Sequence, residues 1–507
     1  MDDKRPAFMR LSDRSVSFLA LAVALGLAGC AVGPNYHQPA PPKVPLTAKP
    51  LPATTGMANG VAQRFDVGGE IAGDWWHLYR SPQLDELITN ALANNPNLKA
   101  AQATLLQAEE TVRAAQGALL PSVSASAGIQ RDKASTAGKA AFGGGGGGVV
   151  VPAYTMHSVS LAVSYTLDLF GGQRRQIENI DAQADYQRWQ LEASYLTLTS
   201  NIVTAAVNEA SLNAQINATQ ALIADERQLL TIMQAQVSLG GAAQTQLLQQ
   251  QAQLAQQEAT LPPLQAQLAQ AQNQLAAYAG QFPGTFDLSR FTLDDLSLPE
   301  TIPVSLPSAL VAQRPDIQAA AAQLHEATAN VGVATANMLP QISLSANIGH
   351  EALASGSLFT PQSLLWSLVA SATQPLFEGG TLTAQRKASV YAMQAAAESY
   401  QATVVAAFEN VADALSALQY DADEAAAADE AADAARQSLA LTQSQYKLGG
   451  EPFSAVLMAE MTYQNALIVD VKAKAARLSD TAALYQALGG GWWHRQDVAK
   501  PCCGVVP

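Results

Sequence analysis

The chain has 507 residues, of which 49% are hydrophobic but only 6% aromatic, and its net charge is -14. That length allows two or three domains, and the composition favours long helices packed through small side chains. The acidic balance excludes nucleic acid as a natural partner, because phosphate backbones repel it. The three cysteines give no disulfide framework. Adjacent cysteines rarely pair within one chain, so Cys502 and Cys503 are expected to form an inert tail.

The N-terminus has the layout of a secretory signal. Basic residues precede an apolar stretch, Val16 to Leu27, which ends in Leu27-Ala28-Gly29-Cys30. The stretch is too short to span a membrane as a helix. Because it ends at a cysteine, it resembles a bacterial lipoprotein signal in which Cys30 is acylated. Ala31, where inner-membrane lipoproteins have Asp, then implies the outer membrane. The alternative is an ordinary signal peptide with a chance cysteine.

The chain repeats itself. Pro96 and Pro315 are separated by 219 residues, as are Pro121 and Pro340. The later landmarks, the Leu-Gly-Gly motifs at 239 and 448 and the pair Gly280 and Gly489, are separated by 209. Helix breakers in the same order indicate a tandem duplication. Between the two predicted strands of repeat 1 lies the hexaglycine Gly143–Gly148, which we place in an extracellular loop.

In each repeat the sequence first predicts two strands. Alternation of apolar residues with Ser, Thr and Asn runs over residues 121–130, 157–168, 340–350 and, less cleanly, 364–374. These runs have about the length of a tilted transmembrane strand. A soluble hairpin with one wet face is the alternative. Four strands cannot close a barrel, and lipid does not tolerate open edges. The pattern therefore demands an oligomer, with eight strands from two chains or twelve from three, and it favours the trimer because that leaves a lumen.

Long helices follow the strands. Residues 173–238 and 381–447 contain no proline, and each could form a helix of about 100 Å that ends at Leu-Gly-Gly. The chain then returns through shorter helices, which would stack end to end with helices such as 98–117. Pro262 and Pro263 are expected to break or kink the first returning helix.

Five sequence blocks carry a family resemblance: "CAVGPNYHQP" from Cys30, "WWHLYRSPQLDELITNALANNPNL" from Trp75, "LPSALVAQRPDI" from Leu306, "QPLFEGG" from Gln374 and "ALGGGW" from Ala487. Together they resemble the TolC-type outer-membrane efflux proteins, in the lipoprotein branch that works with resistance–nodulation–division pumps. The resemblance implies an α+β membrane protein. Its homotrimer would combine a twelve-stranded transmembrane β-barrel, with four strands per chain, and a long α-helical periplasmic barrel.

The resemblance also implies a function. The trimer would be a passive, lipid-anchored duct in the outer membrane of a Gram-negative bacterium. It would carry drugs or other small toxic compounds delivered by a periplasmic adaptor protein and an inner-membrane pump. Such a duct needs no catalytic residue, cofactor or metal ion. The alternatives are a duct for type I protein secretion and a structural coiled-coil tethering lipoprotein.

The predicted segments follow from these landmarks. They are a signal peptide (1–29), a lipidated extension (30–74), repeat 1 (75–280), an equatorial linker (281–313), repeat 2 (314–489) and a C-terminal tail (490–507). Within repeat 1 we expect a β-hairpin at 119–170, a long helix at 173–238, a tip at 239–241 and a returning helix at 242–279. Within repeat 2 the same elements are expected at 340–377, 381–447, 448–450 and 451–488.

Candidate site residues lie at and above the tips. The resemblance implies that the adaptor docks at Leu239, Gly240, Gly241, Leu448, Gly449 and Gly450. Relatives often have an aspartate ring at the aperture, whereas this chain has Gln246, Ala455 and Met458 there; Tyr446 matches a family aromatic that helps hold the aperture shut. An acidic run starts at Asp421. Such runs are commonly solvated outer faces. The alternative is that Asp421, Asp423 and Glu424 line the lumen and favour cations.

Overall fold

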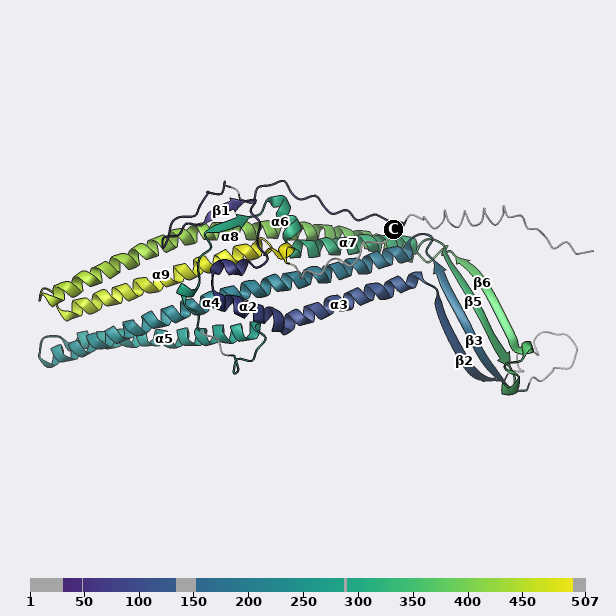
Figure 1. Ribbon diagram of the computed structural model, residues 1–507, viewed down its shortest axis with the longest axis horizontal. Coiled ribbons are helices and arrows are strands. Elements are labelled where there is room, and N and C mark those ends of the chain that lie inside the picture. Colours follow the sequence, from purple (N-terminus) through teal and green to yellow (C-terminus); the bar gives the residue numbers. More distant parts are fainter. Residues whose placement is uncertain (1–30, 48, 134–151, 287–289, 496–507) are drawn as a thin grey trace, which may run out of the picture. The chain divides into compact units, whose positions relative to one another are not determined.

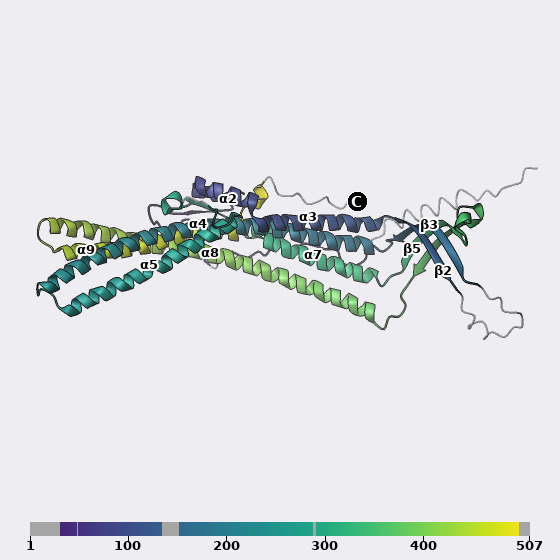
Figure 2. The same ribbon diagram turned by 90° about the horizontal axis from the view of Figure 1, so that it is seen from below.

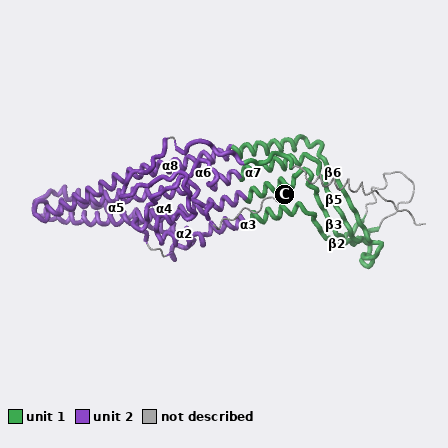
Figure 3. Tube along the Cα trace, turned by 45° about the horizontal axis from the view of Figure 1, so that its top comes forward, with its two compact units in different colours: residues 1–37, 107–184, 322–397 green, residues 38–106, 185–321, 398–507 purple. Residues whose placement is uncertain are grey.

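The computed structural model describes residues 31–47, 49–133, 152–286 and 290–495. Cys30, the hexaglycine segment, Cys502 and Cys503 lie outside these ranges. Contacts divide the chain into two units, coloured separately in Figure 3. Unit 1 comprises residues 1–37, 107–184 and 322–397, and unit 2 comprises residues 38–106, 185–321 and 398–507. Four helices contribute residues to both units: α3 (Pro96–Gln116), α4 (Gly172–Ser238), α7 (Pro315–Ala336) and α8 (Thr381–Lys447).

Unit 1 contains one antiparallel four-stranded sheet in the order β2-β3-β5-β6 (Figure 1). The strands are β2 (Ser122–Asp132), β3 (Tyr154–Leu167), β5 (Gln341–Ala352) and β6 (Leu364–Thr373). The pairing of β3 with β5 joins the hairpins of the two repeats into one sheet.

The register gives the sheet two different faces. On one face Leu161 lies opposite Ala125 and Ile348, and Ile348 lies opposite Trp366. On the other face serines lie opposite each other and hydrogen bond through their hydroxyls: Ser122 with Ser164 at 2.7 Å, Ser126 with Ser160 at 2.9 Å and Ser343 with Ser371 at 2.7 Å. Because side chains alternate along a strand, the sequence pattern predicted this separation of apolar and hydroxyl residues.

Residues 31–37 form an N-terminal strap on unit 1. The Val32 amide donates to the carbonyl of Phe170 at 3.0 Å, and Arg175 donates to the Val32 carbonyl and the Asn35 side chain at 3.1 and 2.6 Å. The Tyr36 ring stacks on His325 with 4.4 Å between centroids. A Cβ on Gly332 would lie 2.9 Å from the Val32 carbonyl, so only glycine allows the strap to approach α7 this closely.

The long helices dominate unit 2. Helices α4 and α8 have 67 residues each, and the returning helices α5 (Gln244–Tyr278) and α9 (Phe453–Ala487) have 35 each. Within unit 2, α5 lies beside α4 and α9 beside α8 (Figure 1 and Figure 2). Among the described residues, none of the helices combines the length and hydropathy required to cross a membrane.

Of the expected break or kink at Pro262 and Pro263, the break is wrong, because α5 continues through both prolines. Each proline removes one backbone donor, which frees the carbonyls of Glu258 and Ala259. Both prolines are exposed, so water can bind the freed carbonyls. Hydrogen bonds on either side of the prolines hold α5 against α4. Arg227 donates to Glu258 at 2.7 Å, and Gln272 donates to Glu209 at 3.1 Å.

The short and returning helices meet end to end at two equivalent joints. In repeat 1, Asn95 caps α3 by accepting from the Leu98 amide at 3.1 Å, and it also donates to the Tyr278 carbonyl at the end of α5 at 2.9 Å. In repeat 2, Arg314 precedes α7 and donates to the Ala487 carbonyl at the end of α9 at 2.6 Å. One side chain therefore closes each joint by satisfying a helix-end carbonyl.

Several small elements pack against the long helices in unit 2. They include a parallel pair, β1 (Arg64–Val67) with β4 (Thr301–Val304), and the helices α2 (Pro82–Asn94) and α6 (Pro307–Gln313). Trp75 in the 3-10 helix Trp75–Tyr79 is 1% exposed and stacks on Tyr485 of α9 at 5.1 Å. Further 3-10 turns occur in unit 2 at Leu293–Asp295 and Trp492–His494. Those in unit 1 are Gly117–Leu119, Ser355–Ser357 and Pro361–Ser363.

Candidate functional site

The two helix tips in unit 2 have the same construction. Each long helix ends in a left-handed glycine, Gly240 with φ 74 and Gly449 with φ 78. The next glycine closes the turn, with Gly241 donating to Gln236 at 2.8 Å and Gly450 to Gln445 at 2.9 Å. The preceding Leu239 and Leu448 are each 87% exposed. Glycine is needed for the positive φ, and each turn presents one leucine to its surroundings.

The four aperture candidates lie close to the tips but differ in environment. The side chain of Gln246 accepts from the Ala243 amide at 3.1 Å and so caps the start of α5. Tyr446 is 44% exposed and packs on Phe453 at 5.4 Å between centroids, while Met458 is 58% exposed. Ala455 is partly exposed. These four positions present one aromatic ring, one amide and two apolar side chains, and none of them is a carboxylate.

Above the tips, α4 contacts α9 along an apolar seam. Leu222 and Leu229 of α4 form one buried cluster with Leu457 and Met461 of α9. The spacing of seven residues on α4 and four on α9 places each pair on one face of its helix. In this seam Asp225 lies near Glu460, and one carboxylate oxygen of Asp225 is buried without a hydrogen-bond partner. Burial, with a smaller contribution from Glu460, raises the pKa of Asp225 to about 6.

This acidic pair was not predicted from the sequence. The signal was available, because Asp225 lies between Leu222 and Leu229 on what must be a packed face. On the other side of α4, the neighbouring Glu226 accepts from Gln250 and Gln253 of α5 at 3.1 and 3.0 Å. At the level of Asp225, the α4–α5 contact is therefore hydrogen bonded, whereas the α4–α9 seam contains two like charges.

The three acidic lumen candidates are not equivalent. Asp423 and Glu424 are exposed, whereas Asp421 is partly buried against Asp480 and Arg477 of α9. Burial, together with a hydrogen bond to the Asp480 carboxyl, raises the pKa of Asp421 to about 7. Asp421 therefore takes part in the α8–α9 contact, and the other two carboxylates remain accessible in the single chain.

Arg477 holds an N-terminal hairpin, Thr54–Arg64, against the same helices. The hairpin turns at Asn59 and Gly60, whose φ values of 52 and 76 fit an Asn-Gly type I′ turn. Arg477 is 2% exposed and donates to the carbonyls of Ala58 and Val61 at 3.1 and 3.0 Å. No local pattern in the sequence indicates this contact, because it joins residues more than four hundred positions apart.

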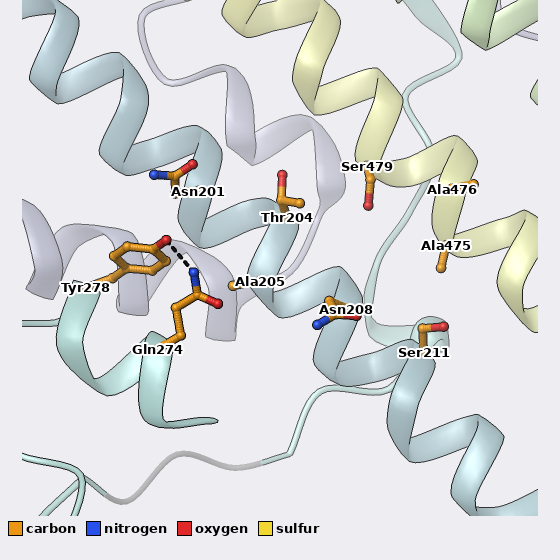
Figure 4. A pocket seen from close by; sticks show the side chains of 10 residues that line it. All are labelled: Asn201, Thr204, Ala205, Asn208, Ser211, Gln274, Tyr278, Ala475, Ala476 and Ser479. Carbon is orange, nitrogen blue, oxygen red and sulfur yellow. Dashed lines mark hydrogen bonds between the residues drawn. The ribbon is translucent and has the colours of Figure 1, made fainter. Parts of the chain in front are cut away.

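Two polar grooves occupy equivalent positions in the two repeats. Groove 1, shown in Figure 4, has a volume of about 370 Å³ and lies among α4, α5 and α9. Its lining is amide, hydroxyl and alanine, and Gln274 donates to Tyr278 at 2.6 Å across its edge. Groove 2 has about 450 Å³ and includes two carboxylates, Asp413 and Asp480. Asn201 in groove 1 corresponds to Asn410 in groove 2 at the 209-residue offset.

Comparison with known proteins identifies the architecture. Residues 87–281 and 306–490 both match the family model described as outer membrane efflux protein. The chain belongs to this family, and the double match agrees with the tandem duplication. It is 29% identical over 461 residues to the pyoverdine export outer membrane protein OpmQ of Pseudomonas aeruginosa, covering 89% of this chain and 95% of that relative.

Two further comparisons extend over nearly the whole chain. The toluene efflux pump outer membrane protein TtgC of Pseudomonas putida is 28% identical over 498 residues, covering 96% of this chain and 98% of the relative. The solved outer-membrane channel OprN is similar with a TM-score of 0.79 and 25% identity, covering 91% of this chain and all of that one. The protein is therefore an outer-membrane component of an efflux system with an α+β, tandem-repeat channel fold. The predicted family, fold class, location and efflux function are confirmed.

Proposed function

We propose that three copies assemble into a passive duct, in which their four-stranded sheets join into one twelve-stranded transmembrane β-barrel. The observation that carries the proposal is the sheet itself. One face is apolar and the other has paired serine hydroxyls, as expected for a wall between lipid and water. Within the described residues, β2 and β6 each pair on one side only, so their other edges remain to be paired.

Acylation of Cys30 would anchor each copy to the outer membrane. The helices would continue the duct into the periplasm, where the tips dock an adaptor that connects to an inner-membrane pump, most simply of the resistance–nodulation–division class. The exposed Leu239 and Leu448 support docking, because each presents an apolar side chain on a rigid turn. Drugs or other small toxic compounds form the proposed substrate class, by analogy with relatives that are named for the export of pyoverdine and toluene.

The aperture would be held by contacts other than a carboxylate ring. Tyr446 on Phe453 and the apolar Met458 replace charges there, so we expect aperture closure to depend weakly on salt. Asp423 and Glu424 are the accessible carboxylates higher on α8 and would bias the duct toward cations.

Conductance of the purified protein in planar lipid bilayers tests the duct. Stable channels from a detergent-resistant trimer are expected, and a monomer without conductance would refute the proposal. Leu239→Asp with Leu448→Asp should abolish cross-linking to the adaptor and leave conductance unchanged. Asp423→Asn with Glu424→Gln should reduce cation selectivity, with the exposed Asp294→Asn as a control far from α8 in sequence.

A further inference from the structure

The two returning helices differ in burial although they are equivalent in the repeat. Helices α5 and α9 have the same length and are related by a constant offset of 209 residues. Leu457 of α9 is 3% exposed, whereas its equivalent Leu248 in α5 is 55% exposed. One turn further on, Met461 is buried and its equivalent Ala252 is exposed. Helix α9 is therefore packed on two faces, and α5 on one.

The long helices show the complementary difference. Leu229 of α4 is 6% exposed, and its equivalent in α8, Ser438, is exposed. Ser211 of α4 is 5% exposed, while its equivalent Tyr420 is 74% exposed. The face of α4 that contacts α9 is therefore buried, whereas the equivalent face of α8 is bare, that is, exposed in the single chain. Likewise, the face of α9 that contacts α4 is buried, whereas the equivalent face of α5 is bare.

The contact between α4 and α9 shows how the bare faces of α8 and α5 could pack against each other. Leu229 and Leu457 belong to one buried cluster. Higher up, Ser200 donates to Gln486 at 2.9 Å, which shows that the two antiparallel helices keep one register along the contact. Transferred by the repeat offset, the Leu229–Leu457 pair becomes Ser438 of one copy and Leu248 of a second copy.

The grooves agree with this transfer. Groove 1 has a third wall from α9, made by Ala475, Ala476 and Ser479 (Figure 4). Groove 2 is lined from α8, α9 and Arg314 alone, so the equivalent wall is missing in the single chain. The residues that would supply it are Ala266, Gln267 and Gln270 of α5, all exposed. Gln270, the equivalent of Ser479, has a carboxamide that can donate to Asp413.

We propose that α5 of a second copy packs on the bare face of α8 in the register of the internal α4–α9 seam, placing its Leu248 against Ser438 and its Gln270 in groove 2 opposite Asp413. The inference rests on the proposed homo-oligomeric duct and adds to it the residue contacts between copies. Since Asp225 and Glu460 correspond to Ala434 and Gln251, the contact between copies has no acidic pair at the position where the internal seam has one.

Disulfide cross-linking tests the register. All variants carry Cys502→Ser and Cys503→Ser, and the proposed acylation blocks the Cys30 thiol, so that only introduced thiols react. Leu248→Cys with Ser438→Cys should convert the oxidised channel in native membranes into covalent oligomers on non-reducing gels. Leu229→Cys with Leu457→Cys is the matched control, because these thiols should pair within one chain and leave the band monomeric. Leu248→Cys with Ala431→Cys is displaced by seven residues, about 10 Å, and should not cross-link.

A second variant pair measures the groove contact. Gln270→Glu places a carboxylate opposite Asp413 and should lower the melting temperature of the oligomer, and adding Asp413→Asn should restore it. A conducting oligomer that cross-links only in the displaced register, or whose melting temperature is unaffected by Gln270→Glu, overturns the inference and leaves the duct intact. A monomer without conductance overturns both the duct and this contact.

Discussion

Replacement of Asp225 by asparagine tests the acidic pair in the α4–α9 seam. Burial and Glu460 raise the pKa of Asp225 from 3.8 to about 6. A shift of this size corresponds to about 3 kcal/mol, which solvent screening of this partly exposed group reduces to about 1 kcal/mol. Between about pH 4 and 6 the packed seam binds a proton that separated helices release, so seam stability falls as pH rises through this window. The penalty is complete above the folded-state pKa.

Asp225→Asn should therefore stabilise the seam by about 1 kcal/mol at pH 7.5 and have almost no effect at pH 4. Hydrogen exchange of the α4 and α9 amides beside the seam measures this, and about fivefold slower exchange is expected at pH 7.5. The exposed Asp423→Asn is the matched control and should leave these amides unchanged. An equal gain at both pH values, or a loss at pH 7.5, would refute the electrostatic account.

Three further predictions concern other contacts. Arg477→Met leaves two carbonyls of the hairpin Thr54–Arg64 without their donor and should weaken its attachment by about 3 kcal/mol, seen as roughly hundredfold faster amide exchange in the hairpin. Gly332→Ala should displace the N-terminal strap, so limited proteolysis should cleave residues 31–37 faster, whereas Gly356→Ala, in open space, should not change cleavage. Asn95→Ala removes a cap and a joint bond and should cost about 2 kcal/mol in thermal unfolding, unlike exposed Asn97→Ala.

Periodicity and helix breakers were sufficient to predict the large elements. The alternation around Leu161 predicted the two faces of the sheet, and the Leu-Gly-Gly motifs placed the tips, because both signals are local in sequence. The error at Pro262 arose because propensity ignores the packing that holds α5 on α4. Long-range contacts had no local signal. Nothing near Arg477 in the sequence indicates the hairpin that it binds, and the pairing of β1 with β4 joins segments that share no pattern.

The helix lengths constrain how this chain can change, because equivalent helices of the two repeats have equal lengths, 67 residues in α4 and α8 and 35 in α5 and α9. Inserting one residue into α4 would advance its far end by about 1.5 Å and turn it by about 100°, which would place the seam leucines on the wrong side. The joint at Asn95 and the tip at Gly240 fix both ends of the returning path, so an insertion in one helix requires a matching one in the other. Length variation among natural versions of this protein should therefore occur in the strand connections and in the linker 281–313. The lengths of α4, α5, α8 and α9 should stay constant.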